Sequence, residues 1–176
     1  MAPMKHTLVA LVEDRPGVLN RVANLFRRRG FNIDSITVGH SEKADISRMT
    51  IVVDGSGASV EQVRKQLAKL IETVKVQDIT SESIVVREMA LIKVKATSAT
   101  RSEIMQIVDI FRANIVDVSM ESLIIEVTGD EEKLDSLLNL LRTFEVKEVV
   151  RTGRIAMTRG SMTTSEPSRK LEVAEG

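Results

Sequence analysis

The sequence predicts an α+β protein made of two tandem βαββαβ units. Two observations support this prediction. Apolar residues with strand-like and helix-like spacing alternate in the order strand, helix, strand, strand, helix, strand, and this order recurs after roughly 80 residues. The order is that of a ferredoxin-like domain, in which two helices cover one face of a four-stranded antiparallel sheet. We therefore expect two ferredoxin-like domains whose other sheet face is open to a partner or a second copy.

The first half supplies six elements in that order. Residues 7–12 are a continuous apolar run of strand length. After a polar turn, apolar residues recur at helical spacing from Val18 to Phe26, and Gly30 is placed to end this helix. Strands are predicted over residues 31–39 and 46–54, and a further strand is predicted to start at residues 74–76. Before the last of these a helix is predicted, with a capping box of Ser59 and Gln62 and an apolar stripe of Val60, Val63, Leu67, Leu70 and Ile71.

The second half repeats the pattern. Strands are predicted over residues 90–96, 115–120, 123–128 and 146–151. One helix follows Thr100, which would form a capping box with Glu103, and another follows Asp130. Their apolar stripes comprise Ile104, Ile107, Val108 and Phe111, and Leu134, Leu137, Leu138 and Leu141.

A polar break at residues 80–83 separates the halves. We expect one domain at residues 4–80 and another at residues 84–159. The periodicity ends after them, and residues 160–176 mix Ser, Thr, Pro and charge, which is typical of a mobile tail. A helix that forms only on packing is the alternative for this tail.

Composition limits the functions open to the chain. The 176 residues include 25 Lys and Arg and 25 Asp and Glu, and a net charge of zero argues against a dedicated nucleic-acid binder. The absence of Cys excludes disulfides, thiolate metal sites and Cys nucleophiles. The two His residues lack the spacing of a metal site, and no phosphate-binding or nucleophile motif occurs. We expect a cytoplasmic, non-catalytic chain without a cofactor or metal of its own.

The polar turn before the first helix is the best candidate for binding chemistry. A helix N-terminus offers backbone N–H groups and a partial positive charge that suit a carboxylate. Gly17 permits close approach to the backbone, and Asp14 can cap the turn or attract an ammonium group. Val18 and Leu19 are candidates to line a side-chain pocket. This segment therefore matches both charges of an α-amino acid, although a plain capped helix start also explains it.

The same segment resembles an ACT domain, the amino-acid-sensing module of biosynthetic enzymes. The run LVALVEDRPGVLNRVANLFRRRGFNIDSITVG carries this resemblance. The chain resembles more specifically the small regulatory subunit of acetohydroxyacid synthase, also called acetolactate synthase. The stretches that carry this closer resemblance are residues 20–26, 29–38, 46–51, 66–70, 74–76 and 87–94, and it extends over about residues 4–160.

The resemblance implies a subunit that pairs with a large catalytic subunit carrying thiamine diphosphate, magnesium and FAD. That enzyme begins the synthesis of valine, leucine and isoleucine. The small subunit would raise its activity and confer feedback inhibition, typically by valine. It would form a homodimer through its ACT domains and bind the effector at their interface.

Carried over to this chain, the resemblance implies an effector site at Asp14, Gly17, Val18, Leu19 and Asn20, with Asn32 and Ile33 approaching from the neighbouring chain. Gly39 matches a position near the same interface. Many family members have Asn where this chain has Asp14. The counterpart in the second half, residues 97–101, lacks a glycine, so no amino acid is expected there.

Two other functions fit the predicted fold. An RNA-recognition motif needs aromatic residues on its central strand, and residues 46–54 have none. An ACT-type sensor of another amino acid that acts on a different enzyme remains open. The size of the pocket around Val18, Leu19 and Ile33 would distinguish that sensor from a valine sensor.

Overall fold

The structure, a computed structural model, describes residues 4–161, 163 and 164. The chain forms two compact units. Unit 1 comprises Met1–Val85 and Ala156–Gly176, and unit 2 comprises Val86–Ile155. Each unit has its own sheet, its own pair of helices and its own apolar core.

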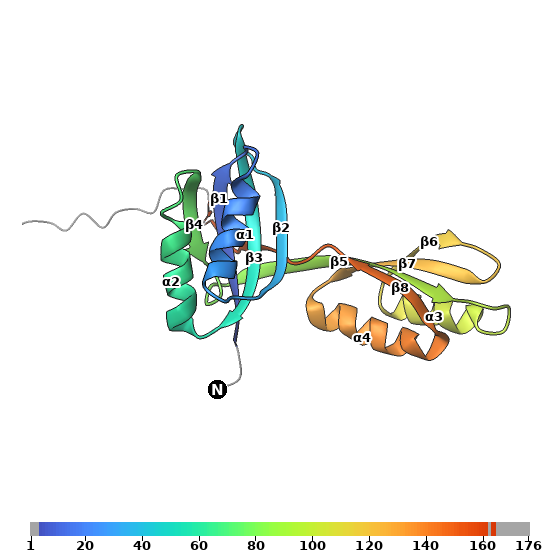
Figure 1. The fold of residues 1–176 in the computed structure, drawn as a ribbon. Coiled ribbons are helices and arrows are strands. Elements are labelled where there is room, and N and C mark those ends of the chain that lie inside the picture. The colour runs from blue at the N-terminus through green and yellow to red at the C-terminus, as the bar shows by residue number, and fades with distance from the viewer. Residues whose placement is uncertain (1–3, 162, 165–176) are drawn as a thin grey trace, which may run out of the picture. The chain divides into compact units, whose positions relative to one another are not determined.

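Unit 1 has the predicted βαββαβ order (Figure 1). Its elements are β1 (Met4–Glu13), α1 (Val18–Arg28), β2 (Ile33–His40), β3 (Ile46–Gly55), α2 (Gly57–Leu67) and β4 (Thr73–Asp78). The strands pair antiparallel in the order β2-β3-β1-β4. The central pair, β3 and β1, is therefore flanked by β2 and β4 as edge strands.

Unit 2 repeats this arrangement. Its elements are β5 (Ile84–Lys95), α3 (Arg101–Ile110), β6 (Asn114–Val118), β7 (Ser122–Gly129), α4 (Glu131–Leu141), a short 3₁₀ helix η1 (Arg142–Phe144) and β8 (Val146–Arg151). The strand order is β6-β7-β5-β8. Together the two units confirm the predicted pair of ferredoxin-like folds.

One strand is absent from the sequence prediction. β9 (Ile155–Thr158) pairs with β5, and the chain then continues with unit 1. The backbone N–H of Arg159 donates to the carbonyl of Ser83 at 2.8 Å. Because the described residues from Ala156 to Thr164 group with unit 1, the observed grouping departs from the predicted limit of 159 for the second domain. The predicted mobile tail, residues 160–176, lies mostly outside the described residues.

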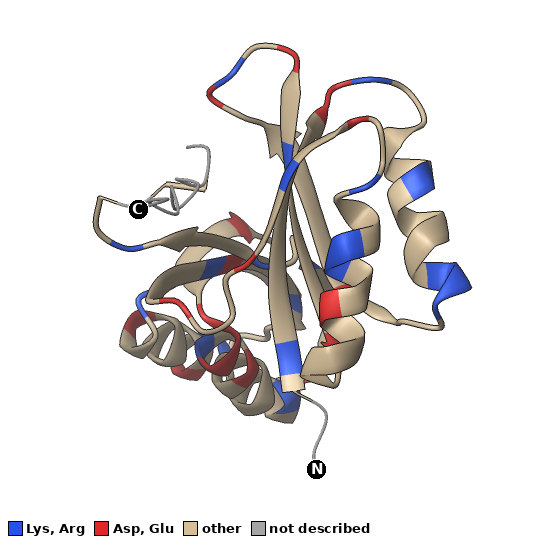
Figure 2. Cartoon of the chain, turned by 90° about the vertical axis from the view of Figure 1, so that its left-hand side faces the viewer, with Lys and Arg blue, Asp and Glu red and all other residues tan. Residues whose placement is uncertain are grey.

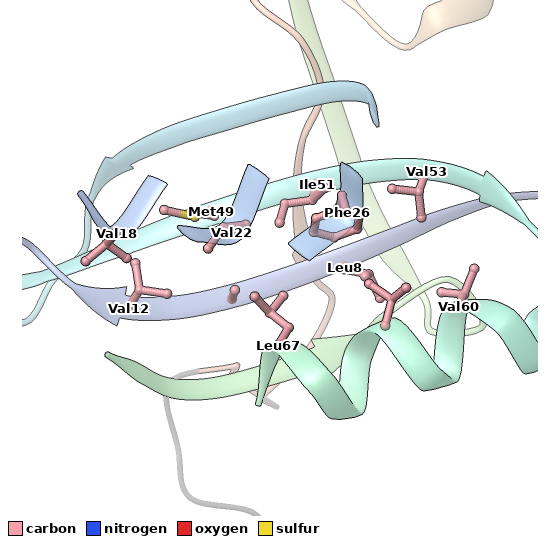
Figure 3. Close-up of a cluster of buried hydrophobic side chains, with 12 residues drawn as sticks. Leu8, Val12, Val18, Val22, Phe26, Met49, Ile51, Val53, Val60 and Leu67 are labelled. Carbon is pink, nitrogen blue, oxygen red and sulfur yellow. The ribbon is translucent and has the colours of Figure 1, made fainter. Parts of the chain in front are cut away.

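The core of unit 1 lies between the helices and one face of the sheet (Figure 3). α1 contributes Val18, Val22 and Phe26, which recur at a spacing of four and are at most 5% exposed. Leu8 of β1 and Ile51 of β3 face them and are fully buried. The apolar stripe of α1 is therefore confirmed as the surface that fixes this helix on the sheet.

The other face of this sheet is covered too. It carries Val9, Leu11 and Val52, which are at most 3% exposed. Arg48, on the same face, donates from Nη2 to the carbonyl of Ala156 at 2.8 Å and from Nη1 to the hydroxyl of Thr164. The expectation of an open face is therefore wrong for unit 1, because β1 and β3 are apolar on both faces and residues 156–161, 163 and 164, called the C-terminal segment below, contact this face through Arg48.

In unit 2 the corresponding face stays open. Leu91 of β5 and its neighbour Val150 of β8 are 38% and 54% exposed. Lys93 and Glu148 pair beside them in the ladder. The predicted open sheet face therefore holds for the second half only.

The observed N-termini of α2 and α3 differ from the capping boxes predicted for them. α2 is capped by Ser56, whose Oγ accepts from the N–H of Ser59, so the capping box of Ser59 and Gln62 is wrong. The physical reason is that the helix begins at Gly57, three residues before Val60. Thr100 is the N-cap of α3 but makes no capping bond with its side chain. In addition, Ile71 lies outside α2 and is 89% exposed, so it does not belong to the stripe.

Candidate functional site

The turn between β1 and α1 places Gly17 at the helix N-terminus. Gly17 is the N-cap residue of α1 and has φ = +87°, a left-handed conformation that other residues adopt at a cost. A Cβ added to it would meet no atom within 4 Å. The position is therefore open to solvent, and the glycine is required by the backbone itself.

Asp14 has a different role from the predicted cap. No side chain caps α1, so that prediction is wrong. The carboxylate of Asp14 instead lies 3.2 Å from Nδ1 of His40, at the end of β2. Its backbone N–H donates to the carbonyl of Asp45 at 2.8 Å. Both side chains are accessible, with Asp14 45% and His40 86% exposed, so this pair is easily exchanged for another partner.

The first turn of α1 lacks any compensating group among the described residues. It contains no acidic residue and receives no hydrogen bond from a capping side chain. The N–H groups of Leu19 and Asn20 lie in this turn, where a helix has no internal acceptors for them. This end of α1 therefore presents N–H donors and the positive end of the helix dipole to a carboxylate.

The side chains that follow Gly17 divide between core and surface. Val18 is 5% exposed and packs in the core, so its side chain does not lie open at the surface of this turn. Leu19 is 48% exposed, and Asn20 is exposed with its Oδ1 accepting from Asn24 at 3.3 Å. Leu19 and Asn20 are therefore the members of this turn whose side chains are accessible to a ligand.

Asn32 and Ile33 lie away from this turn within the same chain. Ile33 pairs with Val53 near the end of β3, whereas His40, beside the turn, pairs with Ser47 near its start. Six residues of strand separate these two pairs, which corresponds to about 20 Å at the usual rise per residue. One chain therefore does not bring all the predicted site residues together.

His40 is the neighbour that the sequence analysis missed. Nothing in the spacing of His40 and Asp14 indicates contact, because they belong to different elements. The contact depends on the ladder register, which places the end of β2 and the end of β1 on either side of the start of β3.

Comparison with known proteins identifies the family. Residues 87–160 match the family model of the small subunit of acetolactate synthase, and residues 8–75 match that of the AHAS small subunit-like ACT domain. The chain is 60% identical over 158 residues to the probable acetolactate synthase small subunit of Archaeoglobus fulgidus, covering 90% of this chain and 99% of that one. The chain belongs to the acetolactate synthase small subunit family.

Other small subunits agree over nearly their whole length. The acetolactate synthase small subunit of Bacillus subtilis is 46% identical over 171 residues, which cover 97% of this chain and 99% of the relative. The crystal structure of the small subunit from Thermotoga maritima has a TM-score of 0.83 and 48% identity, covering 90% of this chain and 99% of that one. The match therefore includes both ferredoxin-like units.

The described residues of this small subunit show two absences. They contain no group of three or more His, Asp or Glu residues arranged to hold a metal ion. They also contain no helix that is both long and apolar enough to pass through a membrane. As a member of the small subunit family, the chain pairs with a separate catalytic subunit of acetolactate synthase.

Proposed function

We propose that this small subunit senses L-valine, or another branched-chain amino acid, and that it activates the catalytic subunit and makes it subject to feedback inhibition. The observation that supports this proposal is the uncapped N-terminus of α1, which lies open at Gly17 and follows the accessible Asp14 by three residues in the same turn. These groups match the two charges of an amino acid.

The ligand's carboxylate would accept hydrogen bonds from the N–H groups of Leu19 and Asn20. Its ammonium would lie against the Asp14 carboxylate, displacing His40. The exposed side chain of Leu19 would contact the branched aliphatic group. Asp14 itself must stay on the ammonium side, because it repels the ligand's carboxylate.

A second copy would complete the site. β2 is an edge strand, and Val38 on it is 43% exposed. If two β2 strands pair antiparallel about a two-fold axis, the start of one lies beside the end of the other. Ile33 and Asn32 of a second copy would then lie near His40, and hence near Asp14. With this pairing, Asp14 of one chain and Ile33 of the other would form one site, although within a single chain they lie near opposite ends of β3.

The test is binding of L-valine to the free chain, with Gly17→Asp as the variant. Calorimetry of the wild type should detect L-valine and much weaker binding of D-valine, and Gly17→Asp should abolish binding because a carboxylate occupies the anion site. Gly160→Asp is the matched control: Gly160 also has positive φ, at +78°, with no atom within 4 Å of an added Cβ. Valine binding by Gly17→Asp at wild-type affinity would contradict the proposed site.

Activation is tested separately, by adding the small subunit to purified catalytic subunit. Gly17→Asp should still raise acetolactate synthesis, while L-valine no longer inhibits it. Leucine, isoleucine and L-valine should be compared, because one methylene changes affinity by only about 1–3 kcal/mol. Loss of activation in Gly17→Asp, with Gly160→Asp unaffected, would mean that the turn contacts the catalytic subunit rather than an effector.

A further inference from the structure

Three adjacent arginines lie at the C-terminal end of α1. Arg27 and Arg28 occupy its last turn and Arg29 is the C-cap residue; all three are exposed. α1 has no acidic residue, and among the described residues no ion pair reaches these three guanidinium groups. Figure 2 shows basic residues in blue on both helices of unit 1. The three arginines therefore form a cluster of uncompensated positive charge, called the arginine cluster below.

On α2, the other helix of unit 1, the charges of the basic residues are balanced by a nearby carboxylate. On α2, Arg64 Nε lies 2.6 Å from Glu61 Oε2, and Lys65 Nζ lies 3.7 Å from Glu61 Oε1. The Glu61 pKa falls to about 2, chiefly through the hydrogen bond from Arg64. The basic residues of α2 thus have a carboxylate within their own helix, whereas the arginine cluster lacks one.

The helix dipole explains only part of this composition. A cation in the last turn of a helix contributes about 0.3–1 kcal/mol, and the effect is confined to that turn. Three like charges close together also repel each other by Coulomb's law, although adjacent helical residues do not face one another. The guanidinium fork binds carboxylates bidentately, and Arg is enriched where a protein surface recognises acidic groups. The cluster therefore suits a carboxylate-rich partner surface better than it suits α1 alone.

Other surfaces of unit 1 are less available to a partner. One sheet face is covered by the chain's own C-terminal segment, which Arg48 holds through Ala156 and Thr164. The β2 edge is assigned to a second copy by the proposed function. The outer surface of α1 and α2 is therefore the part of unit 1 that remains available to a partner. On this surface, the arginine cluster carries positive charge without a neighbouring carboxylate among the described residues.

We propose that the arginine cluster docks on a carboxylate-rich patch of the catalytic subunit, and that α1 couples this contact to the turn of residues 14–17, called the effector turn below. The docking rests on membership of the small subunit family, and the coupling rests on the proposed function. α1 is 11 residues long, about 16 Å, with Gly17 at one end and the cluster at the other. Val18, Val22 and Phe26 hold it on the core as one rigid element.

The coupling is reciprocal. An effector that shifts α1 at its N-terminus changes the position of the arginine cluster at its C-terminus. By linkage, docking of the catalytic subunit must then change effector affinity by the same factor, typically about 5–150-fold.

The test compares two charge-reversal variants of the full chain. Arg27→Glu/Arg28→Glu alters the arginine cluster, and Arg142→Glu/Lys147→Glu alters two exposed basic residues of unit 2 by the same four charges. Affinity for purified catalytic subunit is measured by calorimetry at low and at high salt. The first variant should bind about 100-fold more weakly, and its affinity should depend less on salt than that of the wild type. The control should bind within about threefold of wild type.

Folding and effector binding are checked on the same proteins. Arg27→Gln/Arg28→Gln removes the two positive charges without adding carboxylates at the helix C-terminus. Its affinity for the catalytic subunit should also fall, but by less than that of Arg27→Glu/Arg28→Glu. All variants should bind L-valine alone as the wild type does. Equal affinity of wild type and Arg27→Glu/Arg28→Glu for the catalytic subunit would overturn the docking proposal, as would an equal loss in the control.

The two proposals fail in distinguishable ways. If the free chain binds no amino acid but docking still depends on the cluster, the proposed effector function fails and the docking site stands. If valine binds and docking depends on the cluster, yet valine leaves the affinity for the catalytic subunit unchanged, coupling through α1 is refuted.

Discussion

Replacing Arg48 by Met should loosen the C-terminal segment from the sheet of unit 1. The Arg48 guanidinium donates to the Ala156 carbonyl at 2.8 Å and to the Thr164 hydroxyl. Burial lowers the pKa of Arg48, while the charge of Glu42 opposes this shift. Methionine keeps an apolar stem of similar reach and donates no hydrogen bond. Both acceptors would therefore lose a charged donor, while the apolar contacts largely remain.

The magnitude follows from the two bonds. A hydrogen bond that involves a charged group contributes about 1.5–3 kcal/mol, so two set an upper bound of about 3–6 kcal/mol. Removing a half-buried guanidinium recovers part of its desolvation cost. We expect a net loss of about 2–3 kcal/mol for Arg48→Met. For a chain of this size, that loss lowers the melting temperature by about 4–12 °C.

Thermal unfolding and hydrogen exchange test this expectation together. Arg48→Met should speed exchange at β9 and at the N–H of Arg159, which donates to Ser83. Arg142→Met is the matched control, because Arg142 is exposed. An unchanged melting temperature, with β9 protected as in the wild type, would show that the segment is held by other contacts and would refute the role given to Arg48.

Three smaller predictions concern unit 1. Ser56→Ala should cost about 1 kcal/mol in chemical denaturation by removing the cap of α2, and Ser59→Ala should cost less. Gly30→Ala should destabilise by about 1 kcal/mol or more, because Gly30 ends α1 at φ = +69°. Because the Glu61 pKa is lowered to about 2 in the folded chain, the stability from its ion pair is present above the unfolded pKa of about 4.3 and is lost as the pH falls through about 2. Glu61→Gln should therefore flatten the acid limb of a pH–stability profile.

The fold was predictable because its elements have clear periodicity. The stripe of Val18, Val22 and Phe26 gave α1 its buried face from the sequence alone. β9 was not predictable in this way, because four residues give too little pattern to separate a strand from a loop. The covered sheet face was also missed, although Val9 and Val52 interrupt the polar alternation of a solvent-facing sheet.

The candidate site was predictable to the extent that it depends on local chemistry. The start of α1 at Val18 and the open Gly17 before it follow from neighbouring residues. Whether Val18 faced the core or a ligand could be decided by the helical stripe, and the stripe prediction was right. The pairing of Asp14 with His40 depends on strand register across three strands, which no local pattern specifies.

The counterpart of the effector turn in unit 2 shows why the same fold need not carry the same site. There the N-cap residue is Thr100, with φ = −103°, in place of a left-handed glycine. Its Oγ1 accepts from the N–H of Thr97 at 3.0 Å, and the N–H of Arg101 donates to the Thr97 carbonyl at 2.9 Å. The Arg101 guanidinium is bound to the carbonyls of Ser119 and Met120. The first helical N–H is bound within the turn in both units, since that of Val18 also donates to the Arg15 carbonyl, at 3.4 Å. The two turns differ in charge: the first turn of α3 contains the acidic Glu103, whereas the first turn of α1 has no acidic residue. Because an acidic side chain and a non-glycine N-cap both disfavour a ligand's carboxylate at the start of α3, we expect one amino-acid site per chain, in unit 1.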